Sequence, residues 1–193
     1  MSEKKIKAFN APSCGLDDFR TPAYLLDFIR LRWGLDYDAA CTPNVNNVVP
    51  KTLRLEEEWP KKKWPTTIYS NPPFDTKSII KWIHKGYDWV NKDGEDKKSK
   101  RNERIHVMLI PNKLTVVELQ KECTIGVNPM WNDIIFLGGR INFEGPNVVK
   151  GGASRNGCVL LIQRSYGVLR NSMEFIPLSR IKSIMNNKMD RSD

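Results

Sequence analysis

The sequence predicts an α/β fold: a mostly parallel sheet with an antiparallel edge and helices on both faces. Strand-like and helix-like segments alternate up to about residue 123, and strand-like segments then follow one another closely. With 193 residues, the chain is long enough for one domain with a substantial core and too short for two ordinary ones. We therefore expect an N-terminal arm (residues 1–20), a single domain (21–173) and a C-terminal tail (174–193).

The first expected element is a helix from Ala23 to Trp33. Thr21 suits the N-cap position and Pro22 the first helical position, where the missing N–H of proline is not needed. Gly34 is a natural stop for the helix. The sequence therefore predicts a helix that Thr21 caps and that ends before Gly34.

The remaining elements follow from residue type, apolar spacing and the positions of proline. β-Branched and aromatic residues over 66–70 predict a strand, which two prolines end because neither can donate to a sheet ladder. Apolar residues at helical spacing predict a helix from Thr76. The full set is strands at 35–40, 66–70, 105–110, 134–137 and 157–163, helices from Thr76 and over 114–122, a loop at 42–52, and a helix or strand after Met173.

The positive charge of the chain is unevenly distributed. Lys and Arg number 31 against 22 Asp and Glu, a net charge of +9, yet residues 1–60 hold 8 basic and 9 acidic side chains and residues 61–193 hold 23 and 13. This asymmetry favours a polyanionic partner, although a merely basic, soluble protein remains an alternative. Residues 91–104, with 6 basic and 4 acidic groups, form either a solvated loop or a nucleic-acid contact.

Several classes of protein are disfavoured by the sequence. No apolar run approaches the roughly 20 residues that cross a bilayer, and no apolar segment follows the first residues as in a secretory signal. The cysteines are widely spaced, and only two histidines accompany them, so we expect no metal site and reduced thiols. We therefore expect an intracellular protein, in a bacterial cytoplasm or a eukaryotic nucleus.

The most informative segment is Asn71-Pro72-Pro73-Phe74, here called the NPPF loop. It follows a predicted strand, and open α/β sheets bind ligands outside the carboxyl ends of their strands. The Asn71 side-chain oxygen and the Pro72 carbonyl can accept both N–H groups of a planar amine, while Phe74 stacks on its ring. Two acceptors also offset the positive charge that grows as such an amine attacks an activated electrophile. The loop therefore suits methylation of an amine on a base.

The order and spacing of several motifs make the sequence resemble the phage-type DNA N6-adenine methyltransferases (Dam-like). The resemblance runs from about Thr21 to Gln163. It implies S-adenosylmethionine as the methyl donor and a DNA adenine, flipped out of the duplex, as the acceptor. The segments that carry it are Thr21-Pro22, Asp38-Ala39-Ala40, the NPPF loop, Leu109-Ile110-Pro111, and Gly139-Arg140 with Phe143.

The resemblance also implies roles for individual residues. Asn71, Pro72, Pro73 and Phe74 correspond to the catalytic motif. Thr21 and Pro22 correspond to an element that lines the cofactor pocket, where Phe19 could also pack. Asp38, Ala39 and Ala40 correspond to the first cofactor motif, with the Asp38 carboxylate facing the methionine amine or the ribose; a turn-forming role for Asp38 is the alternative.

The spacing departs from ordinary methyltransferases between Asp38 and Asn71. Only 33 positions separate them, too few for two complete strand–helix units. We therefore predict a reduced Rossmann-like methyltransferase sheet that lacks the element whose carboxylate normally binds the ribose. Residues 56–58, three glutamates, are possible substitutes, although a solvated acidic cluster is the simpler interpretation.

The chain also has no room for a separate DNA-reading domain, so its loops must contact the substrate. Candidates are 91–104, 138–156 and Lys61-Lys62-Lys63 beside Trp64, which is alternatively a core residue. Arg140 could bind a phosphate or form a structural ion pair. Three alternative functions remain: a methyltransferase for an RNA base amine, one for a protein glutamine, and a catalytically silent nucleic-acid-binding protein. The oligomeric state stays open.

Overall fold

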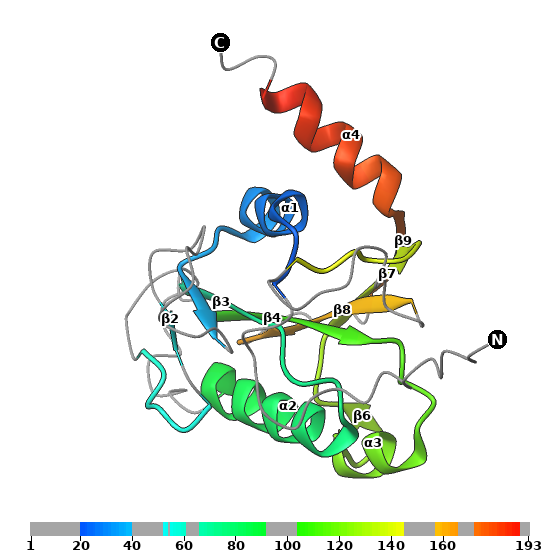
Figure 1. Cartoon of the computed structure of the whole chain (residues 1–193). Helices are drawn as coiled ribbons and strands as arrows, with labels where there is room; N and C mark the ends of the chain where they lie inside the picture. The colour runs from blue at the N-terminus through cyan, green and yellow to red at the C-terminus, as the bar shows by residue number, and fades with distance from the viewer. Residues whose placement is uncertain are drawn as a thin grey trace, which may run out of the picture.

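The computed structural model describes residues 20–39, 52–53, 55–60, 66–91, 104–144, 157–165 and 172–189. Within these residues, seven strands form one sheet in the order β2-β1-β3-β4-β8-β7-β9, and β5 and β6 form a separate hairpin (Figure 1). The strands are β1 (Tyr37–Ala39), β2 (Thr52–Leu53), β3 (Thr66–Ser70), β4 (Arg104–Pro111), β5 (Thr124–Ile125), β6 (Asn128–Pro129), β7 (Asp133–Gly138), β8 (Cys158–Arg164) and β9 (Ser172–Pro177). The helices are α1 (Ala23–Trp33), α2 (Thr76–Asn91), α3 (Val117–Glu122) and α4 (Leu178–Met189).

Six of the seven strands in this sheet run in one direction, and the seventh, β8, runs in the opposite direction. The mostly parallel sheet is confirmed, but the antiparallel strand does not lie at the edge, because β8 is inserted between β4 and β7. Its residues from Cys158 to Gln163 are all buried, as expected for a strand covered on both faces. The residues of β9, in contrast, are exposed or half-buried, which suits an outer strand.

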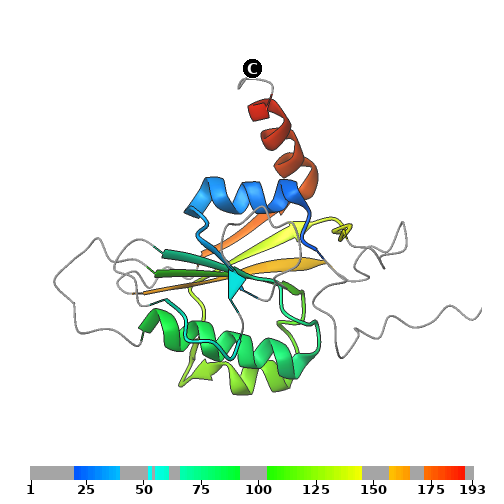
Figure 2. The same cartoon turned by 60° about the vertical axis from the view of Figure 1, so that its left-hand side comes forward.

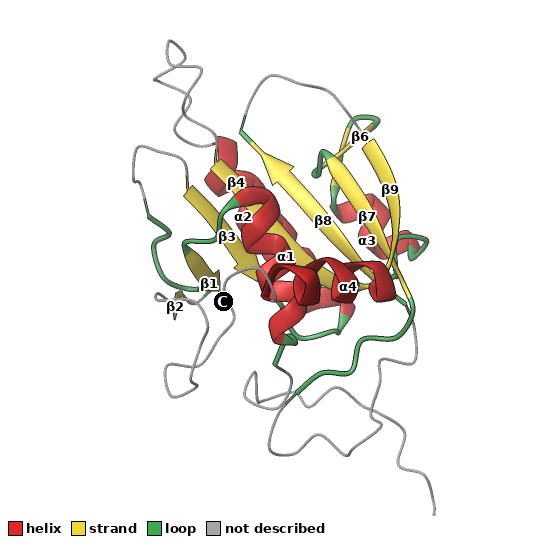
Figure 3. Cartoon of the chain, turned by 90° about the horizontal axis from the view of Figure 1, so that it is seen from above, coloured by secondary structure: helices red, strands yellow, loops and turns green. Residues whose placement is uncertain are grey.

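Helices cover both faces of the sheet, as expected. Figure 2 shows α1 and α4 on one side and α2 and α3 on the other. One apolar core lies under α1 and α4, and a second one packs against α2 and α3. Viewed from above, α1 and α4 lie across the strands (Figure 3). Leu178, Ile181 and Met185 of α4 belong to the first core, so the segment expected as a tail contributes to it.

The start of α1 differs from the prediction. The helix begins at Ala23 and Pro22 occupies the cap position, with no side-chain capping bond. The hydroxyl of Thr21 instead shares a hydrogen bond of 2.7 Å with the Tyr69 hydroxyl on β3. The predicted Thr21 cap is therefore wrong, because a buried hydroxyl partner on the sheet occupies this side chain. The predicted end is confirmed: Gly34, at φ +69°, closes the helix with a hydrogen bond from its N–H to the Arg30 carbonyl.

Most other elements lie where they were expected, with shifted ends. Thr52 begins strand β2, which the expected loop over 42–52 did not include, and α3 begins at Val117. Pro111, expected as a stop, is the last residue of β4 and pairs with Cys158. Residues 40–51 and most of 91–104 lie outside the described part of the chain.

Candidate active site

The NPPF loop lies at the carboxyl edge of the sheet, where β1, β3, β4 and β7 all end. It follows β3 directly and leads into α2. Pro72 is buried, and the side-chain oxygen Oδ1 of Asn71 is buried as well. The acceptor atoms expected to hold an amine are thus fixed beside the protein interior, whereas Phe74 is half-buried.

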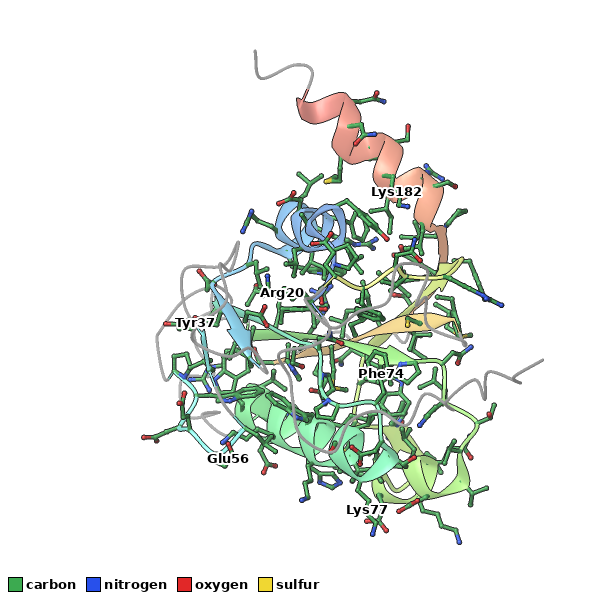
Figure 4. All side chains as sticks on the ribbon, in the orientation of Figure 1. Arg20, Tyr37, Glu56, Phe74, Lys77 and Lys182 are labelled. Atoms are coloured by element: carbon green, nitrogen blue, oxygen red, sulfur yellow. The ribbon has the colours of Figure 1, made fainter. Side chains whose placement is uncertain are left out.

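Two contacts hold the far end of the NPPF loop. The Lys113 Nζ atom, just after β4, donates a hydrogen bond of 2.7 Å to the Phe74 carbonyl. The Phe74 ring meets the buried Phe143 ring edge-on, with 5.6 Å between centroids. Figure 4 labels Phe74 at this edge of the sheet and Lys77 in the first turn of α2. Lys113 therefore holds the backbone at the end of the NPPF loop, and Phe143 contacts the Phe74 ring.

Asp38 lies on the strand next to the NPPF loop. In the parallel pair of β1 and β3, Asp38 is opposite Tyr69 and Ala39 is opposite Ser70, so both stand one strand spacing, about 4.8 Å, from the approach to the loop. Burial raises the pKa of the Asp38 carboxyl to about 7, and within the described residues no charged or hydrogen-bonding group offsets it. A partly buried carboxylate of this kind fits a ligand that brings an ammonium or hydroxyl donors.

Residues 20–22 are held at the same edge. The backbones of Arg20 and Glu144 exchange two hydrogen bonds, of 2.6 and 2.9 Å, and Thr21 is bonded to Tyr69. Since Tyr69 is also opposite Asp38, the structure brings Thr21, Pro22 and Asp38 together with β3 and its NPPF loop. These segments are far apart in the sequence, and that they line a cofactor pocket stays a prediction.

The other candidate residues have mixed outcomes. Arg140 is exposed after the carboxyl end of β7, and the structure gives it no ion pair within the described residues. Ala39 is fully buried in the core against α2. Phe19, Ala40 and Lys61-Lys62-Lys63 lie outside the described part of the chain.

The three glutamates at 56–58 do not reach the site. All are exposed, and their segment lies along the second half of α2: Lys85 donates to the Glu57 carbonyl, and Trp89 donates to the Pro60 carbonyl. Because α2 starts beside the NPPF loop, its second half is remote from it. The solvated acidic cluster is the interpretation that the geometry supports.

Sequence reasoning missed several residues at this edge and in the core beneath it. Lys113, Tyr69 and the buried His106 have no motif of their own, and their contacts depend on the pairing of strands. A signal was present for Lys113, because it follows a predicted strand whose end lies at the same edge as the NPPF loop. Nothing in the sequence pairs Tyr69 with Thr21, which lies 48 positions earlier.

The chain matches the model of a known protein family over most of its length. A family model described as DNA N-6-adenine-methyltransferase (Dam) matches residues 10–190, nearly the whole chain. The chain belongs to the Dam family. Membership confirms the resemblance and implies, at the level of the family, DNA adenine N6-methylation that depends on S-adenosylmethionine. Individually curated proteins give no significant match.

None of the described helices is long and apolar enough to span a bilayer. Among the described residues, no three His, Cys, Asp or Glu side chains gather into a group that could hold a metal ion.

Proposed function

We propose that this chain transfers a methyl group from S-adenosylmethionine to the N6 amine of a flipped-out adenine in DNA. The observation that carries the proposal is the placement of the NPPF loop at the end of β3, one strand away from the partly buried Asp38. An acceptor set for the amine and a carboxylate for the cofactor thus lie side by side. The net positive charge of residues 61–193 supports a nucleic-acid substrate rather than a protein.

The residues of the NPPF loop have distinct tasks in this proposal. Asn71 Oδ1 and the Pro72 carbonyl accept the two N6 hydrogens and hold the nitrogen close to tetrahedral geometry. Phe74 stacks on the adenine ring, and Phe143 keeps the Phe74 ring in place. When bound, S-adenosylmethionine would supply the activated methyl group: its sulfonium–methyl bond would break as the N6–methyl bond forms, a neutral thioether would leave, and N6 would lose a proton to water. Alignment of the amine for in-line attack then supplies much of the rate.

Thr21, Pro22 and Asp38 would hold the cofactor, with Ala39, Phe19 and Ala40 as further candidates. The Asp38 carboxylate suits the methionine ammonium or the ribose hydroxyls, and the Thr21–Tyr69 bond fixes the segment that precedes α1. Arg140 and Lys61-Lys62-Lys63 are the proposed phosphate contacts.

Labelled S-adenosylmethionine tests the proposal with three acceptors: duplex DNA, RNA and a glutamine-containing protein. We expect label in duplex DNA, located at adenine N6 after nuclease digestion and chromatography. Label confined to RNA or to protein would select the corresponding alternative function. Failure to bind the cofactor by calorimetry would favour the catalytically silent protein.

Asn71→Ala tests the catalytic assignment. We expect methyl transfer to fall at least about 100-fold, because the amine loses one of two acceptors, while the cofactor Kd changes less than about threefold. The control is Asn128→Ala in β6, an exposed asparagine that should leave turnover unchanged. Equal turnover of Asn71→Ala and wild type would refute the role of Asn71.

A further inference from the structure

A chain of hydrogen bonds runs through the protein interior and ends next to the NPPF loop. His106 on β4 is fully buried, and its Nε2 atom lies 2.8 Å from the Ser70 hydroxyl, the last residue of β3. Its Nδ1 atom lies 2.7 Å from Oε1 of Gln163, which is directly opposite His106 on β8. Ser70 is bonded through the backbone to Asn71, so the chain ends one residue before the loop.

The direction of each hydrogen bond in this chain follows from the partners of Gln163. Its Nε2 atom donates to the carbonyls of Ile83 (2.9 Å) and Met130 (2.7 Å), so Oε1 is the acceptor toward His106. The proton of the imidazole is therefore on Nδ1, and Nε2 accepts. The Ser70 hydroxyl must then donate to Nε2. Burial lowers the pKa of His106 to about 4, which keeps the ring neutral in this arrangement.

Helix α2 is fitted to the same group of side chains. A Cβ atom at Gly86 would lie 2.0 Å from His106 Nδ1 and 2.1 Å from Gln163 Oε1. Only glycine therefore lets α2 approach this closely. The Trp59 ring covers the imidazole from another side, with 5.2 Å between ring centroids. The imidazole is thus packed against α2, bonded to side chains of β3 and β8, and covered by an indole, and these contacts favour one orientation.

The NPPF loop needs such support from outside, because Pro72 and Pro73 have no N–H to donate. The far end of the loop is held by Lys113 on the Phe74 carbonyl. The near end has the Ser70 hydroxyl, and its bond to the buried imidazole of His106 helps to set where β3 ends and the loop begins. Buried polar groups cost free energy when a partner is missing, so the chain of hydrogen bonds favours a single loop geometry.

We propose that Ser70, His106 and Gln163 are positioning residues that set the geometry of the NPPF loop and thereby of its amine acceptors. The inference rests on the proposed function, since it assigns the network to catalysis rather than to core stability alone. Misplacement of a catalytic group by about 1 Å can cost on the order of 100-fold in rate. The network should therefore affect the methyl-transfer step much more than cofactor binding.

Two variants on the same face of β3 test the proposal. Ser70→Ala removes the donor next to the loop, and Thr66→Ala removes a buried hydroxyl at the other end of the strand. We expect Ser70→Ala to lower the single-turnover rate on an adenine-containing duplex at least about tenfold, with the cofactor Kd within twofold of wild type. For Thr66→Ala, both the single-turnover rate and the cofactor Kd should stay within twofold of wild type. Equal rate losses in the two variants would overturn the proposal.

Substitutions of His106 separate positioning from packing. Glutamine can place an acceptor where Nε2 lies and keep the bond from Ser70, whereas asparagine reaches only the place of Nδ1. We expect His106→Gln to retain several-fold more single-turnover activity than His106→Asn at matched Tm. A purely structural role predicts rates that follow Tm alone, and that result would contradict the assignment.

Hydrogen exchange supplies a readout that needs no activity. Ser70→Ala should speed amide exchange at Asn71 and Phe74 several-fold relative to Thr66→Ala. Unchanged exchange at these amides would overturn the positioning role, even if methyl transfer to DNA is observed. Conversely, a wild-type protein that methylates neither DNA nor any other acceptor would refute the proposed function, while the exchange comparison would still report on the loop.

Discussion

Asp38 carries a structural cost that its proposed role toward the cofactor would offset. Its carboxyl group lies near the carboxyl end of β1, and burial raises its pKa to about 7 from an ordinary value of 3.8. The folded protein therefore retains a proton that the unfolded chain releases, over the pH range between these values. In that range stability declines as the pH rises, because the folded state must either keep the proton or bear a buried charge. A bound cation or hydroxyl donor would remove this penalty.

The variant Asp38→Asn should therefore be stabilised relative to wild type as the pH rises. At pH 5 the carboxyl is mostly protonated in the folded state, so replacing it with a neutral amide should raise the Tm only slightly. At pH 8 the wild type bears the buried charge, so the Tm of the variant should exceed that of wild type by a larger margin. Thermal unfolding at both pH values, without cofactor, measures this. Asp88→Asn, an exposed carboxyl on α2, is the control; an equal response of the two variants would contradict the buried charge.

At the scale of elements, α4 is joined to the rest of the molecule by an apolar face. Ile181 is fully buried, and Leu178 and Met185 are nearly so, in the core that α1 also lines. Lys182 lies over the Tyr24 ring of α1, and Arg32 of α1 forms a salt bridge with Glu174 of β9. Exposed ion pairs contribute little stability, so the apolar contacts carry most of the attachment.

Two isoleucines of α4 provide a matched test of this attachment. Ile181→Ala leaves a cavity in the core and should lower the free energy of unfolding by about 2–4 kcal/mol. Ile184→Ala, on the same helix at 36% exposure, should cost less than about 1 kcal/mol. Urea unfolding monitored by tryptophan fluorescence gives both values. Similar small losses would show that α4 does not belong to the cooperative core.

At the scale of the whole molecule, the sequence predicted those features that depend on local chemistry. The strand before the NPPF loop was predictable because its residues favour strands and prolines end it, and α2 because its apolar positions recur at helical spacing. The interior place of β8 was not predicted, although its unbroken apolar run over Cys158–Ile162 is a signal for a strand covered on both faces.

The polar contacts of the site could not be derived from the sequence in the same way. Ser70, His106 and Gln163 come from three strands, and they meet only because the register places His106 opposite Gln163 and next to β3. The bond between Thr21 and Tyr69 likewise depends on how α1 packs on the sheet. Local spacing carries no information on such contacts, whereas the NPPF motif carries its chemistry within four residues.

The distribution of charge leads to a prediction about DNA binding by the whole molecule. Arg140 is exposed after β7, at the sheet edge that bears the NPPF loop, whereas Arg30 lies in the last turn of α1, toward the opposite edge where β1 begins. A duplex that delivers an adenine to the loop should therefore contact Arg140 and not Arg30. Each phosphate contact contributes about 0.9 to the slope of log K against log salt concentration.

Arg140→Gln should accordingly reduce the magnitude of this slope by about 0.9, and Arg30→Gln, which removes the same charge, should leave it unchanged. Fluorescence anisotropy with one labelled duplex at several salt concentrations measures both slopes. Because the two variants have the same net charge, a general electrostatic effect would change both slopes equally, and that result would contradict the docking of DNA at the carboxyl edge. A change confined to Arg140→Gln would place the phosphate backbone at the edge where β1, β3, β4 and β7 end.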